Sequence, residues 1–124
     1  MEPLRLKPGE DLRGALQERR LTGFVVAGIG SLVRAQLRFA GEFEPTVIAG
    51  PLEILTLSGS LTPDGVHLHA SVSDASGRVV GGHVCAGCAV RTTAELLIAP
   101  LPPGSLAREH DAATGYAELV VRGQ

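Results

Sequence analysis

The sequence predicts an α+β domain, in which a mainly antiparallel β-sheet of about seven strands is flanked by one main helix. Three observations support this fold class. Apolar and polar residues alternate over several short segments. The 16 glycines and 8 prolines suit tight turns between such segments. Helical spacing of apolar residues recurs over one substantial segment. Because no linker divides the 124 residues, we expect a single domain, residues 1–124.

The chain begins with a predicted strand and the main helix. Residues 4–6 alternate as in a short strand, and Pro8-Gly9 marks a turn. From Glu10 to Arg20, acidic residues come first and arginines last, which matches the helix dipole. The apolar residues within this segment recur at helical spacing and are Leu12, Ala15 and Leu16.

A continuous apolar strand, of the kind buried on both faces, is predicted between Thr22 and Gly30. Its Gly28-Ile29-Gly30 resembles the start of a dinucleotide-binding loop. Residues 33–39 alternate as a strand, however, where a nucleotide-binding fold requires a helix. The glycines therefore serve a turn or close backbone packing, and no nucleotide cofactor is expected.

The remaining strands follow the same alternating pattern. Residues 52–61 form one strand, and Thr62-Pro63-Asp64-Gly65 is a turn that leads into a hairpin rich in histidine. Two further strands are expected at 92–99 and 115–121. Between them, an irregular segment that starts at Leu101 carries His110, which we expect at the surface.

The histidine hairpin concentrates the plausible metal ligands of the chain. His67 and His69 lie two residues apart, so they share one face of a strand. Asp74-Ala75-Ser76-Gly77 reads as a type I turn in which Gly77 takes a positive φ, which pairs Asp74 with Arg78. This register places His83 opposite His69 and Cys85 opposite His67. A shift of one residue would move His83 to the other face.

Three neutral imidazoles from neighbouring strand positions could hold zinc or a similar ion, which predicts a metal site at His67, His69 and His83. A fourth position would remain for water, Cys85 or another group. The alternative is that these are ordinary hydrogen-bonded or solvated strand histidines. The residues alone leave both interpretations open.

The sequence contains residues for two other chemistries. Cys85 and Cys88 form a C-x-x-C pair, but their surroundings look extended, whereas redox pairs of this kind lie at a helix N-terminus. We therefore expect Cys88 to be a small buried residue. Glu53 stands among apolar neighbours, where it could act as a general base or as a partner of a metal-bound histidine; an ordinary edge or interface glutamate is the favoured interpretation.

Charge and hydropathy restrict the partners. The formal net charge is −2 and the 11 basic residues are spread along the chain, which disfavours direct nucleic-acid binding. No apolar run is long enough to cross a bilayer, and residues 1–7 lack the features of a signal peptide. We therefore expect a cytoplasmic protein that does not bind membranes.

Taken together in order and spacing, several motifs resemble the plants and prokaryotes conserved domain family, usually called the PPC domain. The resemblance covers nearly the whole chain. Its carriers are Leu6–Leu12, Gly28–Leu32, Gly50–Gly59, His67-Leu68-His69 with Asp74 and Gly77, Gly81-Gly82-His83, and Thr93-Ala94-Glu95.

The resemblance implies a homotrimer and, in some prokaryotic members, a metal held by the histidines that match His67, His69 and His83. The plant relatives bind DNA through AT-hook segments. This chain has no such Arg-Gly-Arg-Pro segment, so DNA binding is possible by family only. Trimerisation also has a physical rationale, because a single helix can cover only part of an apolar sheet.

Three functions are compatible with these residues. We favour a trimeric, zinc-capable binding module for a protein or small ligand, more readily than an enzyme. The alternatives are a DNA-associated transcriptional regulator and a metal-dependent hydrolase or lyase, in which metal-bound water is the nucleophile and Glu53 or Glu95 assists.

Overall fold

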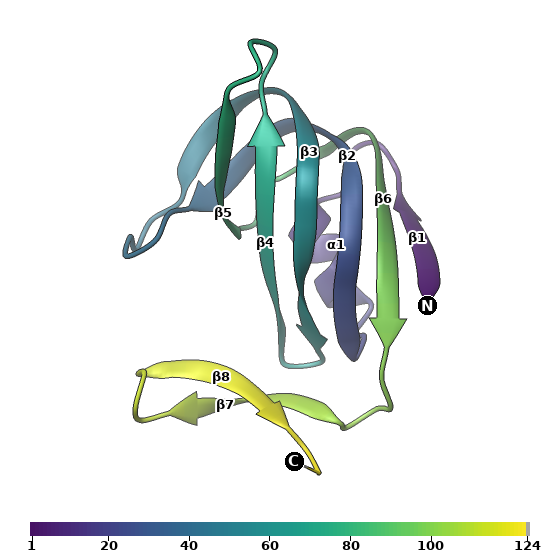
Figure 1. Cartoon of the computed structure of the whole chain (residues 1–124), viewed down its shortest axis with the longest axis vertical. Coiled ribbons are helices and arrows are strands. Elements are labelled where there is room, and N and C mark those ends of the chain that lie inside the picture. The colour runs from purple at the N-terminus through teal and green to yellow at the C-terminus, as the bar shows by residue number, and fades with distance from the viewer. Residues whose placement is uncertain (124) are drawn as a thin grey trace.

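The computed structural model describes residues 1–123, which form eight strands and one short helix. The fold is mostly antiparallel β-structure, with one strand more than the sequence predicted and a helix of 7 residues. No helix within this part of the chain is long and apolar enough to span a membrane. The elements, labelled in Figure 1, are β1 (Glu2–Leu6), α1 (Leu12–Glu18), β2 (Gly23–Arg38), β3 (Thr46–Thr62), β4 (Gly65–Ser73), β5 (Val79–Val84), β6 (Val90–Pro100), β7 (Leu106–Asp111) and β8 (Tyr116–Val121).

Six strands form one antiparallel sheet in the order β1-β6-β2-β3-β4-β5. The two long strands, β2 and β3, curve strongly, as Figure 1 shows. As a result the end of β2 also pairs with β5, where Leu37 lies opposite Val84 and Arg38 opposite His83. This second pairing closes β2, β3, β4 and β5 into a ring at one end of the sheet, and it brings Arg38 to the histidine hairpin.

Helix α1 packs on one face of this sheet. Its N-cap is Asp11, whose side chain accepts a hydrogen bond from the backbone N–H of Gly14. The predicted apolar positions Leu12, Ala15 and Leu16 are all buried, and they join a core of leucine and valine side chains from the sheet. The spacing therefore placed the buried face of the helix correctly, although the helix ends at Glu18 rather than at Arg20.

The opposite face of the sheet carries exposed apolar side chains. We expected residues 24–29 to be buried on both faces. Val25 is 2% exposed, but Phe24, Val26 and Ile29 are 38%, 46% and 56% exposed. The expectation was wrong for the single chain, because the one helix covers the inner face only. Leu55 of β3, 46% exposed, adds to this outer apolar face.

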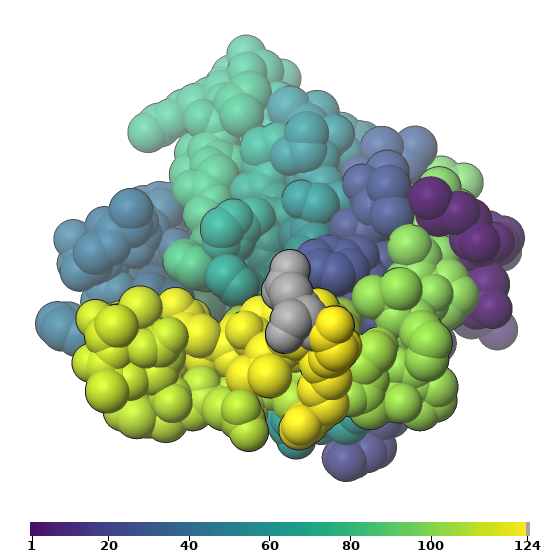
Figure 2. Space-filling model, turned by 60° about the horizontal axis from the view of Figure 1, so that its bottom comes forward, coloured from purple at the N-terminus to yellow at the C-terminus, as the bar shows by residue number. Residues whose placement is uncertain are grey.

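Strands β7 and β8 form a separate two-stranded hairpin beneath the main sheet. Figure 2, seen from that end, shows the hairpin in yellow and yellow-green across the near side of the molecule. Arg108 attaches it to the sheet: its Nη2 donates to Ser60 Oγ (2.5 Å) and its backbone N–H to Asp64 Oδ2 (3.1 Å). His110 is exposed, as expected, but it lies on β7 rather than in an irregular segment.

Candidate functional site

The turn between β4 and β5 has the predicted geometry. Gly77 has φ +83°, its N–H donates to the carbonyl of Asp74 (3.0 Å), and the Asp74 N–H donates to the carbonyl of Arg78 (3.0 Å). The Asp74 carboxylate also accepts hydrogen bonds from Ser76 Oγ (2.6 Å) and from the Arg78 N–H (3.0 Å). These bonds, above all the one from the Ser76 hydroxyl, lower the pKa of Asp74.

The turn sets the register that brings the histidines together. His69 lies opposite His83, as the sequence predicted. The predicted pairing of Cys85 with His67 was wrong, because β5 ends at Val84 and the chain turns toward β2. There the Cys85 N–H donates to the carbonyl of Gln36 (3.0 Å). The closure of β2 onto β5 thus takes Cys85 away from β4.

The imidazoles of His67, His69 and His83 form one compact cluster. The ring centroids of His67 and His83 are 5.2 Å apart and the rings are stacked, with 17° between their planes. The His69 ring stands nearly perpendicular to both, with centroids 4.9 Å from His67 and 4.5 Å from His83. One nitrogen from each ring lies within 4.8 Å of the others. Two of the rings are exposed and that of His83 is half-buried.

The electrostatic environment favours neutral imidazoles. Burial lowers the pKa of His67, and the nearby charges of His69 and Arg108 lower it further. Burial also lowers the pKa of His83, with a second contribution from Arg38. The lowered pKa values favour the neutral form of both rings, which is the form that binds a metal.

This donor set fits a borderline transition-metal ion. In a tetrahedral zinc site with Zn–N bonds of about 2.1 Å, the ligand nitrogens lie roughly 3.4 Å apart. The three nitrogens are already within 4.8 Å, so small side-chain rotations would bring them onto one ion. Imidazole ligands suit zinc, copper, nickel and iron. His67, His69 and His83 would hold such an ion and leave one position open.

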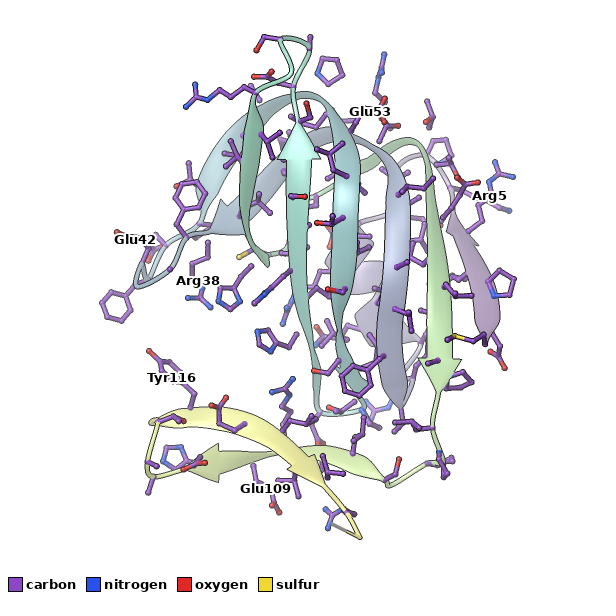
Figure 3. The ribbon with its side chains drawn as sticks, in the orientation of Figure 1. Arg5, Arg38, Glu42, Glu53, Glu109 and Tyr116 are labelled. Atoms are coloured by element: carbon purple, nitrogen blue, oxygen red, sulfur yellow. The ribbon has the colours of Figure 1, made fainter. Side chains whose placement is uncertain are left out.

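The other candidate residues lie outside this cluster. Glu53 is opposite Ser73, whereas His69 is opposite Ser58. Five residues of strand separate these levels, roughly 16 Å. Figure 3 shows Glu53 near the top of the molecule, on the side away from the β7–β8 hairpin. Glu95 is on β6, opposite Ile29. Within one chain, neither carboxylate is part of the histidine cluster.

The two cysteines also take no part in the cluster. Cys88 is fully buried, as predicted, and burial raises the pKa of its thiol. Its sulfur packs beside Gln36, whose backbone N–H lies 3.3 Å away. Cys85 is half-buried, and its thiol donates to the carbonyl of His83 (3.7 Å). The C-x-x-C pair therefore serves packing next to the end of β5.

A groove adjoins the cluster, between the end of the sheet and the β7–β8 hairpin. Its volume is about 940 Å³, and we call it the histidine groove. Its walls combine two of the imidazoles with residues from four other segments, among them His67, His83, Arg13, Arg38, Glu42, Phe43, Asp64, Arg108, Tyr116 and Glu118. A smaller hollow of about 460 Å³ adjoins His67 and His69 and is floored by Phe24, Ser58 and Ser60.

Sequence reasoning missed most of these wall residues. Arg38 and Tyr116, labelled in Figure 3, come from the end of β2 and the start of β8. Arg108 comes from a strand that the alternation did not reveal. No local pattern marks them, because they meet only through the closure of β2 onto β5 and the docking of the hairpin.

Comparison with known proteins agrees with this fold. Residues 3–102 match the family model described as the Plants and Prokaryotes Conserved (PCC) domain. A Synechococcus protein named "Bifunctional protein GlmU" is 50% identical over 122 residues, which are 94% of this chain and 20% of that protein. The chain thus spans a fifth of the length of this curated relative.

Two solved structures are similar over nearly the whole chain. A hypothetical protein from Salmonella is 38% identical, with a TM-score of 0.85, over 98% of this chain and 93% of that one. A protein from Archaeoglobus fulgidus, described as metal-containing, is 27% identical, with a TM-score of 0.76, over 96% of this chain and 91% of that one. The sheet and its flanking helix are therefore an arrangement that other proteins share.

Proposed function

This chain belongs to the Plants and Prokaryotes Conserved domain family, as the resemblance in its sequence predicted, and we propose that it is a zinc-binding module that works as a homotrimer. The observation that carries the metal proposal is the approach of three imidazole nitrogens from His67, His69 and His83 to within 4.8 Å of one another. The similarity to an archaeal protein described as metal-containing gives further support.

Neutral imidazoles offer ring nitrogens to a metal ion, and protonation of one ring disfavours protonation of its neighbours. A bound zinc ion would be held by three imidazole nitrogens, and it would act as a Lewis acid toward a ligand in its open position. The chain's own residues then position that ligand. The register set by the Asp74–Gly77 turn keeps His69 and His83 on one face.

Elemental analysis of the purified protein tests the metal proposal. We expect one zinc ion per chain in the wild type and loss of the metal in His69→Ala. The matched control is His110→Ala, which changes a histidine on the exposed part of β7 and should keep the full zinc content. Equal zinc content in both variants would contradict the proposal. The same measurement distinguishes zinc from copper or nickel, which imidazoles also bind.

The proposal of a trimer is based on the outer apolar face of the sheet. Phe24, Val26 and Ile29 of β2 and Leu55 of β3 are between 38% and 56% exposed. Apolar patches of this kind mark interaction surfaces. A second and third copy of the chain would cover the face that α1 leaves open.

A metal-dependent hydrolase or lyase is the second candidate, favoured by the histidine groove beside the open metal position. Because Glu53 and Glu95 lie elsewhere in the sheet, Glu118 in the groove wall replaces them as the candidate proton acceptor. Turnover that requires both zinc and Glu118 would favour the enzyme; ligand binding without turnover favours the module.

A further inference from the structure

We infer that the histidine groove binds a small organic molecule that carries an oxyanion, either a carboxylate or a phosphate, held by Arg38 and Arg108. The inference extends the proposed function by naming the class of ligand. It rests on that function only for the position of the ligand next to the metal. It rests independently on the shape, charge and apolar surface of the groove.

The groove has the size of a small-molecule site. Its volume of about 940 Å³ lies within the range of about 300–1,000 Å³ that is typical of ligand pockets. His67 and His83 are part of its wall. A ligand in the groove therefore lies beside the open position of a metal held by the histidine cluster.

The charges in the groove leave two guanidinium groups available. Three arginines and three carboxylates line it, so the groove is not cationic by count. Within residues 1–123, however, the one ion pair at 4.0 Å or less joins Arg19 to Glu10, which flank the two ends of α1. Neither Arg38 nor Arg108 therefore forms an ion pair with Glu42, Asp64 or Glu118 of the groove.

The hydrogen bonds of the arginines lead to the same conclusion. Arg13 donates to the carbonyls of Val66 and Val84, so it braces the strands. Arg38 uses one N–H on the carbonyl of Glu42 (3.2 Å), and Arg108 uses one on Ser60 Oγ. Each guanidinium has five N–H donors, so both keep several for a ligand. An oxyanion accepts such bonds in pairs, with a geometry that matches the planar fork.

The two arginines come from different elements that line the groove beside the histidine cluster. Arg38 is paired in the sheet with His83, and its charge acts on that imidazole. Arg108 belongs to the hairpin, and its charge acts on His67. An oxyanion near the cluster would therefore meet positive charge from the sheet and from the hairpin at once.

The organic part of the ligand is indicated by exposed aromatic rings. The chain has only three phenylalanines, one tyrosine and no tryptophan. Two of these four aromatic residues, Phe43 and Tyr116, line the groove and are 89% and 67% exposed. They come from different segments, the loop after β2 and the start of β8. Burial of such exposed rings against an apolar or planar group of a ligand is energetically favourable.

Part of the groove wall lies outside the residues that match the family model. Arg108, Tyr116 and Glu118 follow residue 102, where the match to the family model ends. The histidines lie inside the match. The groove wall therefore combines two parts of the chain: His67, His83 and Arg38 lie inside the match, and the hairpin residues lie beyond it.

Calorimetric titration tests the inference, with phenyl phosphate, benzoate and inorganic phosphate as probes, on zinc-loaded and on chelator-treated protein. We expect at least one aromatic oxyanion to bind more tightly than inorganic phosphate, and the two aromatic probes distinguish phosphate from carboxylate. Arg38→Gln should weaken binding by about tenfold or more, because a charge-assisted pair of hydrogen bonds is lost. Tyr116→Ala should weaken the binding of phenyl phosphate or benzoate but leave the affinity for inorganic phosphate unchanged.

The matched control is Arg5→Gln, an exposed arginine on β1, which Figure 3 shows on the opposite side of the molecule. It should leave every affinity within about twofold. Arg108→Lys serves as a second variant that keeps the charge but loses the planar fork. No binding of any probe, or equal affinities for Arg38→Gln and the control, would overturn the inference.

The two proposals fail in different ways. Zinc without probe binding overturns the groove ligand and leaves the metal site standing. Probe binding that depends on Arg38, in a purified protein whose zinc content is the same in wild type and His69→Ala, supports the groove and contradicts the metal site.

Discussion

Asp11 joins the start of α1 to the loop before β6 through one carboxylate. Its Oδ2 accepts from the Gly14 N–H (2.8 Å), and its Oδ1 accepts from the N–H groups of Gly87 (2.8 Å) and Cys88 (2.9 Å). The side chain therefore caps the helix and fixes the segment that follows Cys85. Ala86 at the start of that segment lines the histidine groove, so Asp11 stabilises part of the groove wall without lining the groove itself.

We predict that Asp11→Ala lowers the free energy of unfolding by about 2–3 kcal/mol. Loss of an N-cap costs about 0.5–2 kcal/mol, and two partly buried N–H groups also lose a charged acceptor. Urea denaturation measures the change. The control is Glu109→Ala, at an exposed position on β7, which should stay within about 0.5 kcal/mol of the wild type. Similar losses in both variants would contradict the role given to Asp11.

At the residue scale, the sequence predicted what depends on near neighbours. Cys88 was expected to be buried, and the histidine pair across the hairpin was placed correctly because a turn of known geometry relates His69 to His83. Arg38 and Arg108 were missed as site residues. Their position depends on contacts between segments far apart in the chain, and periodicity carries no information about those contacts.

The β4–β5 hairpin is the element that assembles the candidate metal ligands. Two constraints fix its register: the three-residue loop before Arg78, and the pairing of His83 with Arg38 on β2. The sequence revealed the first constraint only. Both constraints favour the same strand register. For this reason the register that the turn alone predicts agrees with the register in the sheet.

Shortening the loop changes the first constraint and leaves the second in place, so their effects on the register can be distinguished. We predict that deletion of Ala75 abolishes zinc binding, because a two-residue loop shifts the register by one and turns His83 to the other face of the strand. Elemental analysis measures the loss. Gly77→Ala is the control: it keeps the loop length, costs about 1–2 kcal/mol of stability through its positive φ, and should retain zinc. Full zinc content in the deletion variant would mean that the β2–β5 pairing alone sets the register.

Strand β7 shows why one strand escaped prediction. Leu106 and Ala107 are buried, but the next four residues, Arg108 to Asp111, are polar and mostly exposed. The alternation that identified the other strands is therefore absent. The strand is held instead by its partner β8, by the turn in which the Gly115 N–H donates to the carbonyl of Asp111 (2.8 Å), and by the attachment of Arg108 to Ser60. These are tertiary contacts, which a local pattern cannot show.

At the scale of the whole molecule, one helix is too small for the sheet it covers. Figure 1 shows α1 behind the sheet, while the opposite face is open above the hairpin. The exposed apolar side chains on that open face include Ile29, which is 56% exposed. Burial of such a side chain in an interface contributes about 1.5–3 kcal/mol when complete, so the proposed trimer gains at three equivalent positions.

We predict that Ile29→Lys converts the trimer into a monomer, because a charged side chain in the centre of an apolar interface loses its hydration. Light scattering after size-exclusion chromatography gives the mass, and circular dichroism checks that the strands are retained. Val79 on β5 is also 56% exposed but lies next to the Asp74–Gly77 turn, so Val79→Lys is a control of equal exposure that should stay trimeric. A monomeric wild type would contradict the proposed trimer. If both variants remain trimeric, the interface does not include the exposed face of β2 at Ile29.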